Sequence, residues 1–335
     1  MRAPSFWWKP GRGSLLSPLG GIYGAAAWLR LQKAGRSAGI PVICLGNLTV
    51  GGAGKTPAAL TVARILLAAH RRPFFLSRGY GGRLRGPVTV NPKFHRAADV
   101  GDEPLLLARL APTIVARDRV AGAEAARFGG ASVIVMDDGF QNPSLQKDLA
   151  ILLVDSRRGI GNGQIFPAGP LRAPLGAQLA RAHALVTVGA GDGAAIVERD
   201  ARRRRLPIFH GRIAPDPETV AALAGRKVLA FAGIADPGKF FTTVEQAGIV
   251  IGARQEFADH HCYTAAEARD LLARAQADNL VLLTTEKDHV RLAGNSELET
   301  LAEHASTLPV RLVIDEDEAF RQMVVSAAQR GAGGR

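Results

Sequence analysis

The sequence predicts an α/β protein: a mostly parallel β-sheet with helices on both faces, followed by a second, smaller three-layer α/β lobe. Short, continuous apolar runs, which are typical of strands buried on both faces, alternate with helix-forming segments along most of the chain. The 335 residues are 47% hydrophobic, which is enough for two domains that each bury a core. A glycine-rich loop also separates the first of these apolar runs from a helix-forming segment.

Residues 1–36 are predicted to form a basic, aromatic helical segment that lies at a membrane interface. No charge occurs between Arg12 and Arg30, but prolines and glycines interrupt this run, and it is short for a bilayer span. Aromatic and apolar residues flanked by Arg and Lys are typical of a helix in the headgroup region. The alternative is a helix that packs on the domain and leaves its basic ends exposed. The aromatic residues concerned are Trp7, Trp8, Tyr23 and Trp28.

A nucleoside-triphosphate site is predicted in the loop after the first buried strand, Val42 to Leu45. Backbone N–H groups of such a loop bind phosphates, the lysine reaches the outer phosphates, and the threonine hydroxyl ligates magnesium. The usual pattern has glycine at the position of Thr49. The predicted nucleotide-binding residues are Thr49, Val50, Gly51, Gly52, Ala53, Gly54, Lys55 and Thr56.

Residues 37–200 are predicted to form the core domain around this loop. Asp137 and Asp138 stand where a buried strand ends, the position from which phosphate-loop enzymes hold magnesium through an aspartate. An Asp-Gly turn is the structural alternative, and the sequence does not say which aspartate is the ligand. The further strands expected in this domain cover residues 73–77, 88–90, 112–116, 132–136, 149–154 and 184–188.

Residues 201–226 are predicted to be a linker, and residues 227–335 the smaller C-terminal lobe. The linker holds four consecutive arginines and is then rich in proline and glycine. Thr264 and Glu267 fit a capping box at the start of a helix. The elements expected in the lobe are strands at 228–232, 280–284 and 310–314 and helices at 239–247, 264–275 and 318–329.

Positive charge is concentrated in the first third of the chain. The net charge is +12, yet the residues before Asp99 carry fifteen Lys and Arg and no acidic residue, whereas the rest holds 27 basic and 30 acidic residues. This asymmetry predicts an anionic partner: nucleic acid, acidic lipid headgroups or a phosphorylated substrate. Cys44 and Cys262 form neither a disulfide framework nor a zinc motif, which indicates a reducing compartment.

Several other polar residues have two interpretations. Asp102 and Glu103 precede a predicted helix, and the residues alone favour a capping role over acid–base chemistry. His260, beside Asp259, is free to titrate near neutrality. The TEKD segment at 285–288 is similar to the guanine-reading motif of GTPases, but its lysine stands one place too late. Arginines in loops after strands suit a phosphate-bearing substrate, and they are Arg78, Arg83, Arg85, Arg117, Arg119 and Arg172.

Seven motifs occur along the chain in a recognisable order: GNLTVGGAGKTP (46–57), SRGYGG (77–82), GDEP (101–104), DDGFQ (137–141), GPLRAP (169–174), FADHH (257–261) and TEKD (285–288). In this the chain resembles the tetraacyldisaccharide 4′-kinases, the lipid A kinases of Gram-negative bacteria. The resemblance spans nearly the whole chain, and DDGFQ with SRGYGG is far more specific than the phosphate loop alone. It implies a P-loop NTPase-like core.

The resemblance implies transfer of the γ-phosphate of ATP, with Mg²⁺, to the 4′-hydroxyl of a tetraacylated glucosamine disaccharide 1-phosphate. It also implies a peripheral protein on the cytoplasmic face of the inner membrane. The expected partners are then the membrane-embedded glycolipid and the anionic membrane surface, with no nucleic acid and no obligate protein partner.

The matching motifs also imply roles for single residues. Lys55 and Thr56 bind ATP and magnesium, Lys55 also acts in catalysis, and Asp137 or Asp138 completes the metal site. Asp102 becomes the acidic group that acts on the sugar hydroxyl, which replaces its capping role. It is assisted by a histidine of the DHH triplet, for which we select His260, and the implied substrate-binding residues are Arg78, Tyr80, Arg119 and Arg172. The family motif continues with glutamate where this chain has Ala173.

Two functions of other classes are to be weighed against a lipid kinase. One is a soluble phosphate-loop NTPase that acts as a switch or metal chaperone, with water as its only phosphate acceptor. The other is a basic nucleic-acid-binding protein, but aromatic residues make up only 6% of the chain and the basic segment is also the apolar one.

Overall fold

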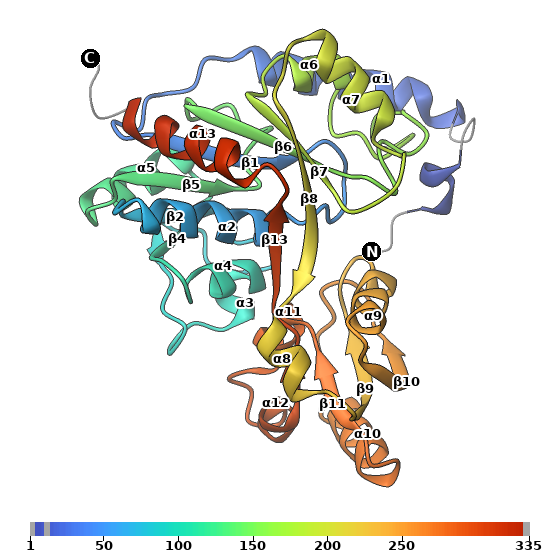
Figure 1. The fold of residues 1–335 in the computed structure, drawn as a ribbon. Coiled ribbons are helices and arrows are strands. Elements are labelled where there is room, and N and C mark those ends of the chain that lie inside the picture. Colours follow the sequence, from blue (N-terminus) through green and yellow to red (C-terminus); the bar gives the residue numbers. More distant parts are fainter. Residues whose placement is uncertain (1–3, 10–13, 331–335) are drawn as a thin grey trace.

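The structure is a computed structural model in which residues 4–9 and 14–330 are described. The ends of the predicted N-terminal segment and C-terminal lobe, at 1–3, 10–13 and 331–335, lie outside the described residues. The chain forms a large lobe and a small lobe, joined by two adjacent antiparallel strands of the large sheet, one leading to the small lobe and one returning from it (Figure 1).

The large lobe is built on a nine-stranded sheet, which confirms the predicted fold class. The strands from β8 to β4 are parallel, and only the edge strands β13 and β3 are antiparallel to their neighbours. In spatial order the strands are β13 (Val310–Ile314), β8 (Ile208–Pro215), β7 (Ala184–Val188), β6 (Leu149–Asp155), β1 (Val42–Asn47), β5 (Val133–Asp137), β2 (Pro73–Ser77), β4 (Thr113–Val115) and β3 (Val88–Thr89).

Helices cover both faces of this sheet, because the central strands are apolar on both sides. One face packs on α2 (Lys55–Ala68) and α13 (Asp317–Arg330). Two short helices, α3 (Ala97–Val100) and α4 (Asp102–Leu107), lie between β3 and β4 in the chain. The opposite face packs on α1 (Ser17–Gln32), α5 (Arg119–Phe128), α6 (Leu175–Leu179) and α7 (Ala195–Arg203).

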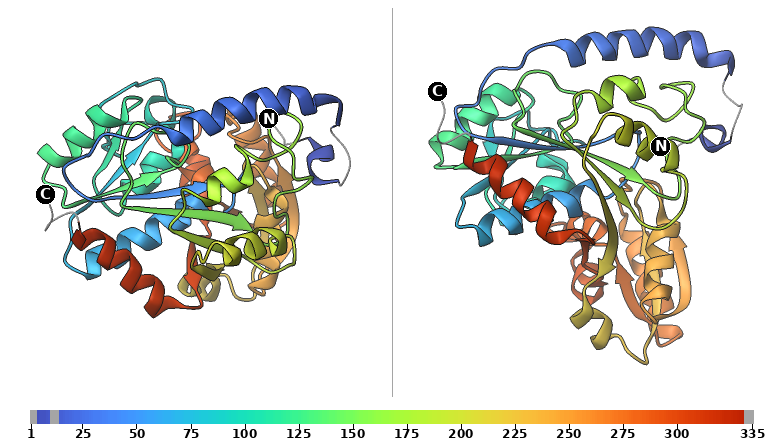
Figure 2. Two further views of the ribbon diagram at one scale, coloured as in Figure 1. Left: turned by 90° about the horizontal axis from the view of Figure 1, so that it is seen from above. Right: turned by 45° about the horizontal axis from the view of Figure 1, so that its top comes forward.

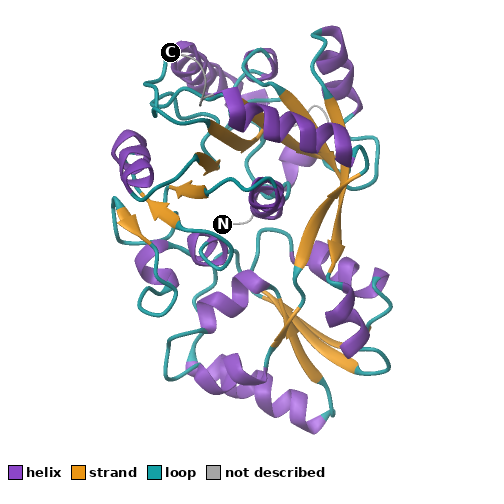
Figure 3. Cartoon of the chain, turned by 60° about the vertical axis from the view of Figure 1, so that its left-hand side comes forward, coloured by secondary structure: helices purple, strands orange, loops and turns teal. Residues whose placement is uncertain are grey.

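The small lobe is a three-layer unit, with helices on both sides of a four-stranded parallel sheet (Figure 3). Its strands, in spatial order, are β10 (Val250–Glu256), β9 (Lys227–Ala232), β11 (Val281–Thr284) and β12 (Ser306–Thr307). The predicted capping box of Thr264 and Glu267 is present. The helices are α8 (Pro217–Ala222), α9 (Pro237–Gln246), α10 (Ala265–Ala277), α11 (Glu286–Leu292) and α12 (Glu299–His304).

The boundaries of the lobes differ from the sequence prediction at two places. The expected linker 201–226 contains strand β8, a full member of the large sheet. The expected lobe 227–335 ends early, because β13 returns to pair with β8, and α13 packs against α2. Strand β13 was expected in the small lobe because it follows that lobe in the sequence, whereas its partner lies about 100 residues earlier.

Helix α1 packs on the large lobe through small residues and exposes large apolar ones. A Cβ atom built at Gly24 would lie 2.6 Å from the Cδ1 atom of Ile165, so the helix closely approaches the loop that contains Ile165. None of the described helices is long and apolar enough to cross a bilayer. The side chains exposed on and just before α1, at the outer edge of the molecule (Figure 2), are Leu15, Leu19, Ile22, Tyr23, Trp28 and Leu29.

Trp7 is not part of this exposed face, so the expectation that it belongs to the aromatic residues at a membrane interface is wrong for this residue. It belongs to a 3₁₀ turn, Ser5–Trp8, and is 4% exposed. Its indole N–H donates to the Pro167 carbonyl at 3.0 Å, and its ring packs edge-on against Phe166. Trp7 therefore holds the N-terminal turn on the large lobe.

Candidate active site

The phosphate loop leaves the end of β1 at the centre of the large sheet. The Asn47 side chain donates to the Gly51 carbonyl at 2.6 Å, and the Val50 N–H donates to the Pro170 carbonyl at 2.8 Å. Gly54 has φ +84° and directly precedes α2, so a left-handed residue turns the chain into the helix. A Cβ atom at Gly51 or Gly52 would meet no atom within 4 Å, which leaves open space beside the loop.

The departure at Thr49 has a local explanation. Thr49 is not among the residues with positive φ, and it forms an antiparallel β-bridge with Leu171. An extended backbone at this position needs no glycine. The loop is therefore held by the segment around Leu171 and Arg172, whose guanidinium donates to the Thr49 carbonyl at 3.2 Å.

Asp137 ends strand β5, which lies beside β1, and it pairs in register with Leu45. It is 1% exposed, and neither carboxylate oxygen has a hydrogen-bond partner among the described residues. Burial, reinforced by the charge of Glu103 and opposed by Lys55, raises the pKa of Asp137 to about 7. An unpartnered buried carboxylate is costly, and hard divalent cations prefer oxygen ligands, so this side chain fits Mg²⁺.

Asp138 has a different environment from its neighbour. Its φ of +51° turns its carboxylate toward basic side chains: Arg172 binds it through two nitrogens, at 2.7 and 3.2 Å, and the Lys55 ammonium lies at 3.4 Å. Burial alone would raise the pKa of Asp138, but Lys55 and Arg172 outweigh burial and lower it. The two aspartates that the sequence left equivalent therefore differ: Asp138 is paired, and Asp137 is not.

A second polar cluster joins the two lobes at Asp102. This residue begins α4 of the large lobe, and its Oδ2 atom lies 3.2 Å from Nδ1 of His260, which precedes α10 in the small lobe. The Tyr80 ring lies beside the imidazole, with 5.3 Å between ring centroids. The structure thus brings together three predicted site residues from separate motifs.

The electrostatics of this pair follow from its surroundings. Burial alone would raise the pKa of Asp102, but the His260 hydrogen bond and the charges of Arg291 and Lys287 hold it well below its usual range. The same hydrogen bond raises the pKa of His260. Asp102 is therefore ionised at neutral pH.

The two clusters are electrostatically connected through Glu103. Its carboxylate accepts a hydrogen bond from Lys287 of α11 at 2.6 Å. Glu103 raises the pKa of Asp137, and Lys287 lowers it. Lys287 also lowers the pKa of Asp102, so the charge of this one lysine acts on the carboxylates of both clusters.

Two predicted substrate-binding residues, Arg78 and Arg119, take no part in the ion pairs described above for Asp138 and Asp102. Arg78 is exposed on the loop after β2. Arg119 is buried at the start of α5, where one guanidinium nitrogen donates to the Ala116 carbonyl at 2.6 Å and Nε has no partner among the described residues. The charges of Asp137 and Asp138 act on Arg119, but no ion pair joins it to either of them in the described chain.

The DHH triplet does not form a metal site, and no group of three or more metal-binding side chains occurs in the described ranges. His261 stacks on Phe257 and pairs with Glu267 at 3.0 Å. Cys262 is exposed. His260 alone of the triplet reaches Asp102.

The sequence reasoning missed Arg291, which contacts Asp102 from α11. Its guanidinium is 7% exposed, and its Nε atom donates to Asp102 Oδ2 at 2.8 Å. The only local signal is its position three residues after Asp288, on the same helix face as the TEKD aspartate. The lysine of TEKD, Lys287, donates to the Glu103 carboxylate.

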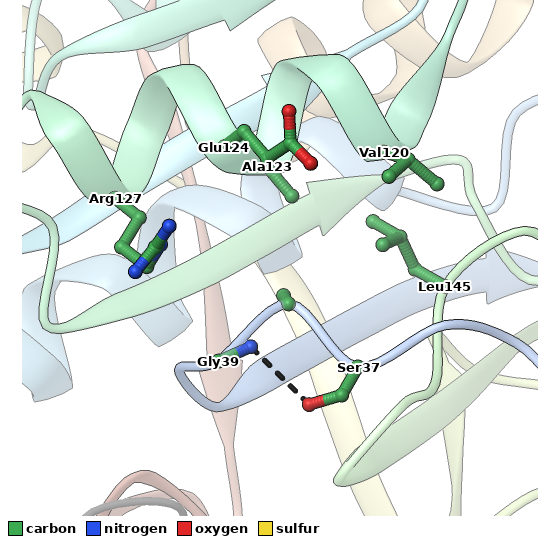
Figure 4. A pocket seen from close by; sticks show the side chains of 8 residues that line it. Ser37, Gly39, Val120, Ala123, Glu124, Arg127 and Leu145 are labelled. Carbon is green, nitrogen blue, oxygen red and sulfur yellow. Dashed lines mark hydrogen bonds between the residues drawn. The ribbon is translucent and has the colours of Figure 1, made fainter.

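A cavity of about 190 Å³ lies elsewhere (Figure 4). It is lined by Ser37, Ala38, Gly39, Val120, Ala123, Glu124, Arg127 and Leu145. Gly39 precedes β1, whereas the phosphate loop follows it, so the cavity lies at the opposite end of that strand from the loop. It takes no part in the site.

Known proteins similar to this chain cover almost all of it. The family profile described as tetraacyldisaccharide-1-P 4′-kinase matches residues 12–329. A tetraacyldisaccharide 4′-kinase of Nitrobacter winogradskyi is 50% identical over 327 residues, 97% of each chain. One from Rhodopseudomonas palustris is 51% identical over 333 residues, 99% of this chain and 97% of that protein.

A solved structure is similar over the same range. It is a crystal structure of LpxK from Aquifex aeolicus in complex with ATP, with a TM-score of 0.71 and 26% sequence identity. The match covers 94% of this chain and 99% of that one. With the family profile and the relatives at about 50% identity, this shows that the chain belongs to the tetraacyldisaccharide 1-phosphate 4′-kinase family.

Proposed function

We propose that this protein transfers the γ-phosphate of ATP to the 4′-hydroxyl of a tetraacylated glucosamine disaccharide 1-phosphate, in lipid A biosynthesis. The observation that carries the proposal is the pairing of a phosphate loop with the Asp102–His260 pair, contributed by two lobes. The loop suits the phosphoryl donor, and the pair suits an acceptor hydroxyl. A soluble NTPase switch would need only the phosphate loop and not the Asp102–His260 pair.

The donor half of the reaction uses the loop and β5. The loop N–H groups and the N-terminus of α2 bind the phosphates of ATP, and Lys55 neutralises charge that develops on the transferred group. Thr56 and Asp137 would hold Mg²⁺, which would neutralise part of the negative charge of the phosphates of ATP. Asp138 keeps Lys55 and Arg172 in place through its ion pairs.

The acceptor half uses Asp102 and His260. Phosphoryl transfer passes through a loose transition state, so positioning and charge matter more than early proton removal. Asp102 accepts the hydrogen bond of the sugar hydroxyl and orients its oxygen toward the γ-phosphate. His260, whose pKa is raised by its hydrogen bond to Asp102, shares the proton that leaves late in the reaction. Arg78, Tyr80, Arg119 and Arg172 are proposed to contact the phosphorylated substrate.

The lipid substrate requires the enzyme to work at a membrane surface, and α1 suits this role. The helix is about 24 Å long, too short to span the hydrocarbon core. It exposes Ile22 and Leu29, while Arg30 and Lys33 follow at its end. Apolar burial together with attraction of cations to anionic headgroups, about 1 kcal/mol each, would hold the enzyme on the cytoplasmic face of the inner membrane.

The proposal is tested by incubating the full chain with γ-labelled ATP, Mg²⁺ and the disaccharide 1-phosphate. We expect the label to enter the organic-extractable lipid. Label found only in inorganic phosphate, at the same rate with and without lipid, would support an NTPase switch and contradict the kinase.

Asp137→Asn is expected to raise the melting temperature of the metal-free protein at pH 8 by about 2 °C or more. A carboxyl whose pKa is higher in the folded state destabilises that state as pH rises from about 4 to about 7, and asparagine removes this penalty. Mg²⁺ with a non-hydrolysable ATP analogue should stabilise the parent much more than the variant. The measurement is thermal unfolding with and without the metal.

The matched variant is Asp138→Asn. Because Asp138 is paired with Lys55 and Arg172, its loss should lower the melting temperature instead. If both variants shift stability in the same direction, the assignment of Asp137 to the metal is incorrect.

The double variant Ile22→Asp/Leu29→Asp is expected to lower partition onto phosphatidylglycerol vesicles at least tenfold. The two side chains are 71% and 58% exposed, so the fold should be unaffected, whereas each contributes about 1.5–3 kcal/mol when buried in lipid. Vesicle sedimentation measures the effect. Phe94→Asp, which changes an exposed ring on the loop after β3, is the control, and equal loss of binding in both proteins would refute the role of α1.

A further inference from the structure

The TEKD segment, at 285–288, has no role in the reaction described above, yet with Arg291 it forms a buried polar cluster against Asp102. Arg291 donates to Asp102 Oδ2 through both Nε and Nη2. Its remaining terminal nitrogen, Nη1, donates to the Gly233 carbonyl at 2.7 Å and to Asp288 Oδ1 at 2.9 Å. The guanidinium thus binds one carboxylate from each lobe.

Asp288 is itself held rigidly. It is fully buried, and its Oδ1 atom also accepts hydrogen bonds from the Gly233 N–H at 3.0 Å and the Tyr263 hydroxyl at 2.9 Å. Its Oδ2 atom accepts one from the Thr285 hydroxyl at 2.6 Å. A carboxylate with this many donors keeps its orientation, and it therefore fixes the plane of the Arg291 fork.

The same network reaches the second member of the pair. The Gly233 carbonyl accepts from Arg291 and also from the backbone N–H of His260, at 3.0 Å. His260 has φ +55°, an uncommon conformation for a non-glycine residue, so its backbone needs such support. Arg291 therefore contacts Asp102 directly and is linked to His260 through one peptide group.

The hydrogen bonds distinguish the two oxygens of Asp102. Oδ2 lies within reach of two Arg291 nitrogens and of His260 Nδ1. Oδ1 accepts only the Glu103 N–H, at 2.8 Å, among the described residues. Oδ2 is therefore surrounded by donors from Arg291 and His260, whereas Oδ1 has one donor, so Oδ1 is the atom with acceptor capacity left for a hydroxyl.

We propose that Arg291 is a positioning residue for phosphoryl transfer, which holds Asp102 so that Oδ1 faces the acceptor hydroxyl. The inference rests on the proposed function, because the oriented carboxylate must have a hydroxyl to act on. It also gives the TEKD segment a role, since Asp288 orients Arg291 while Lys287 binds Glu103, the neighbour of Asp102.

The test compares Arg291→Gln and Arg291→Lys with the parent in the lipid-kinase assay. Arg291→Gln should lower kcat about 100-fold, as a misplaced catalytic group does, and leave the KM for ATP within about twofold. Arg291→Lys keeps the charge but not the planar fork, so it should lose about tenfold. In an Asp102→Ala background, Arg291→Gln should cost no more than about threefold further, because the two residues act as a unit.

Arg321→Gln provides the control, because it breaks an exposed arginine–aspartate pair on α13, and it should keep the parent's kcat. A kcat for Arg291→Gln within threefold of the parent, or a full 100-fold loss in the Asp102→Ala background, would overturn the inference. If Arg291→Gln does not fold, the test rests on Arg291→Lys. A kcat for Arg291→Lys equal to that of the parent would then contradict the inference. A parent that fails to label the lipid instead refutes the proposed function.

Discussion

Lys55→Met should lower the rate of phosphoryl transfer about 1000-fold. The Lys55 side chain is the cation on the phosphate loop, and removal of one preorganised charge-stabilising group at a transition state costs about 10²–10³ in kcat. Methionine has nearly the same length, so the loop should keep its conformation. The measurement is single-turnover transfer to lipid at saturating ATP, with the affinity for a fluorescent ATP analogue determined in parallel.

Lys227→Met provides the matched control for Lys55. Lys227 is an exposed lysine at the start of β9, remote in the chain from every motif of the site. It should retain the parent's rate. If Lys55→Met transferred phosphate at the parent's rate, the loop would not be the element that binds the reacting phosphates.

Asp102→Ala should lower kcat by about 10²–10⁴ while the affinity for ATP changes less than about threefold. The reason is that Asp102 contacts the acceptor side of the site, whereas the loop and β5 hold the donor. Asp102→Asn fills the same space and should lose nearly as much, because an amide cannot accept a proton. Initial rates with varied ATP and varied lipid separate the two substrates.

The same variants should change the pH dependence. The hydrogen bond to Asp102 raises the pKa of His260, and Asp259 acts in the same direction, whereas burial and Arg291 lower it. If neutral His260 is the active form, parent activity rises with pH through this elevated pKa. In Asp102→Asn the pKa of His260 falls, so the acid limb of the residual kcat/KM should move to lower pH. A limb that moves upward would argue against the pair.

Asp317→Asn is the corresponding control for Asp102, because its carboxylate pairs with Arg321 at an exposed position on α13. It should match the parent in kcat, in KM and in pH profile. Equal turnover in Asp102→Asn and the parent would refute the role of Asp102.

Much of the large lobe could be predicted from sequence because its signals are local. Strands β2, β7 and β13 begin and end at the residues predicted from their apolar runs. The loop from Thr49 to Thr56 was found through the spacing of its glycines and lysine. Strand β8 was assigned to a linker because only part of it is buried, so it lacks a continuous apolar run.

Long-range pairing could not be predicted in the same way. Arg291 and Asp102 are separated by 189 positions, so no spacing rule connects them. Asp137 and Asp138 are adjacent and identical, and only the backbone turn at Asp138 places its carboxylate beside Lys55, whereas the Asp137 carboxylate has no hydrogen-bond partner in the part of the chain that the structure describes. A strand that returns to a sheet from another lobe, as β13 does, likewise has no signal in its own residues.

The most direct measurement is the structure of the lipid formed by the parent in one turnover with an equimolar amount of ATP. Phosphorus–proton correlation NMR should show a single new phosphomonoester on the 4′-carbon of the distal glucosamine, with one ADP released per lipid. Inorganic phosphate in place of the ester, or an ester on another hydroxyl, would contradict the claim that these two lobes bring a loop-bound triphosphate to that hydroxyl.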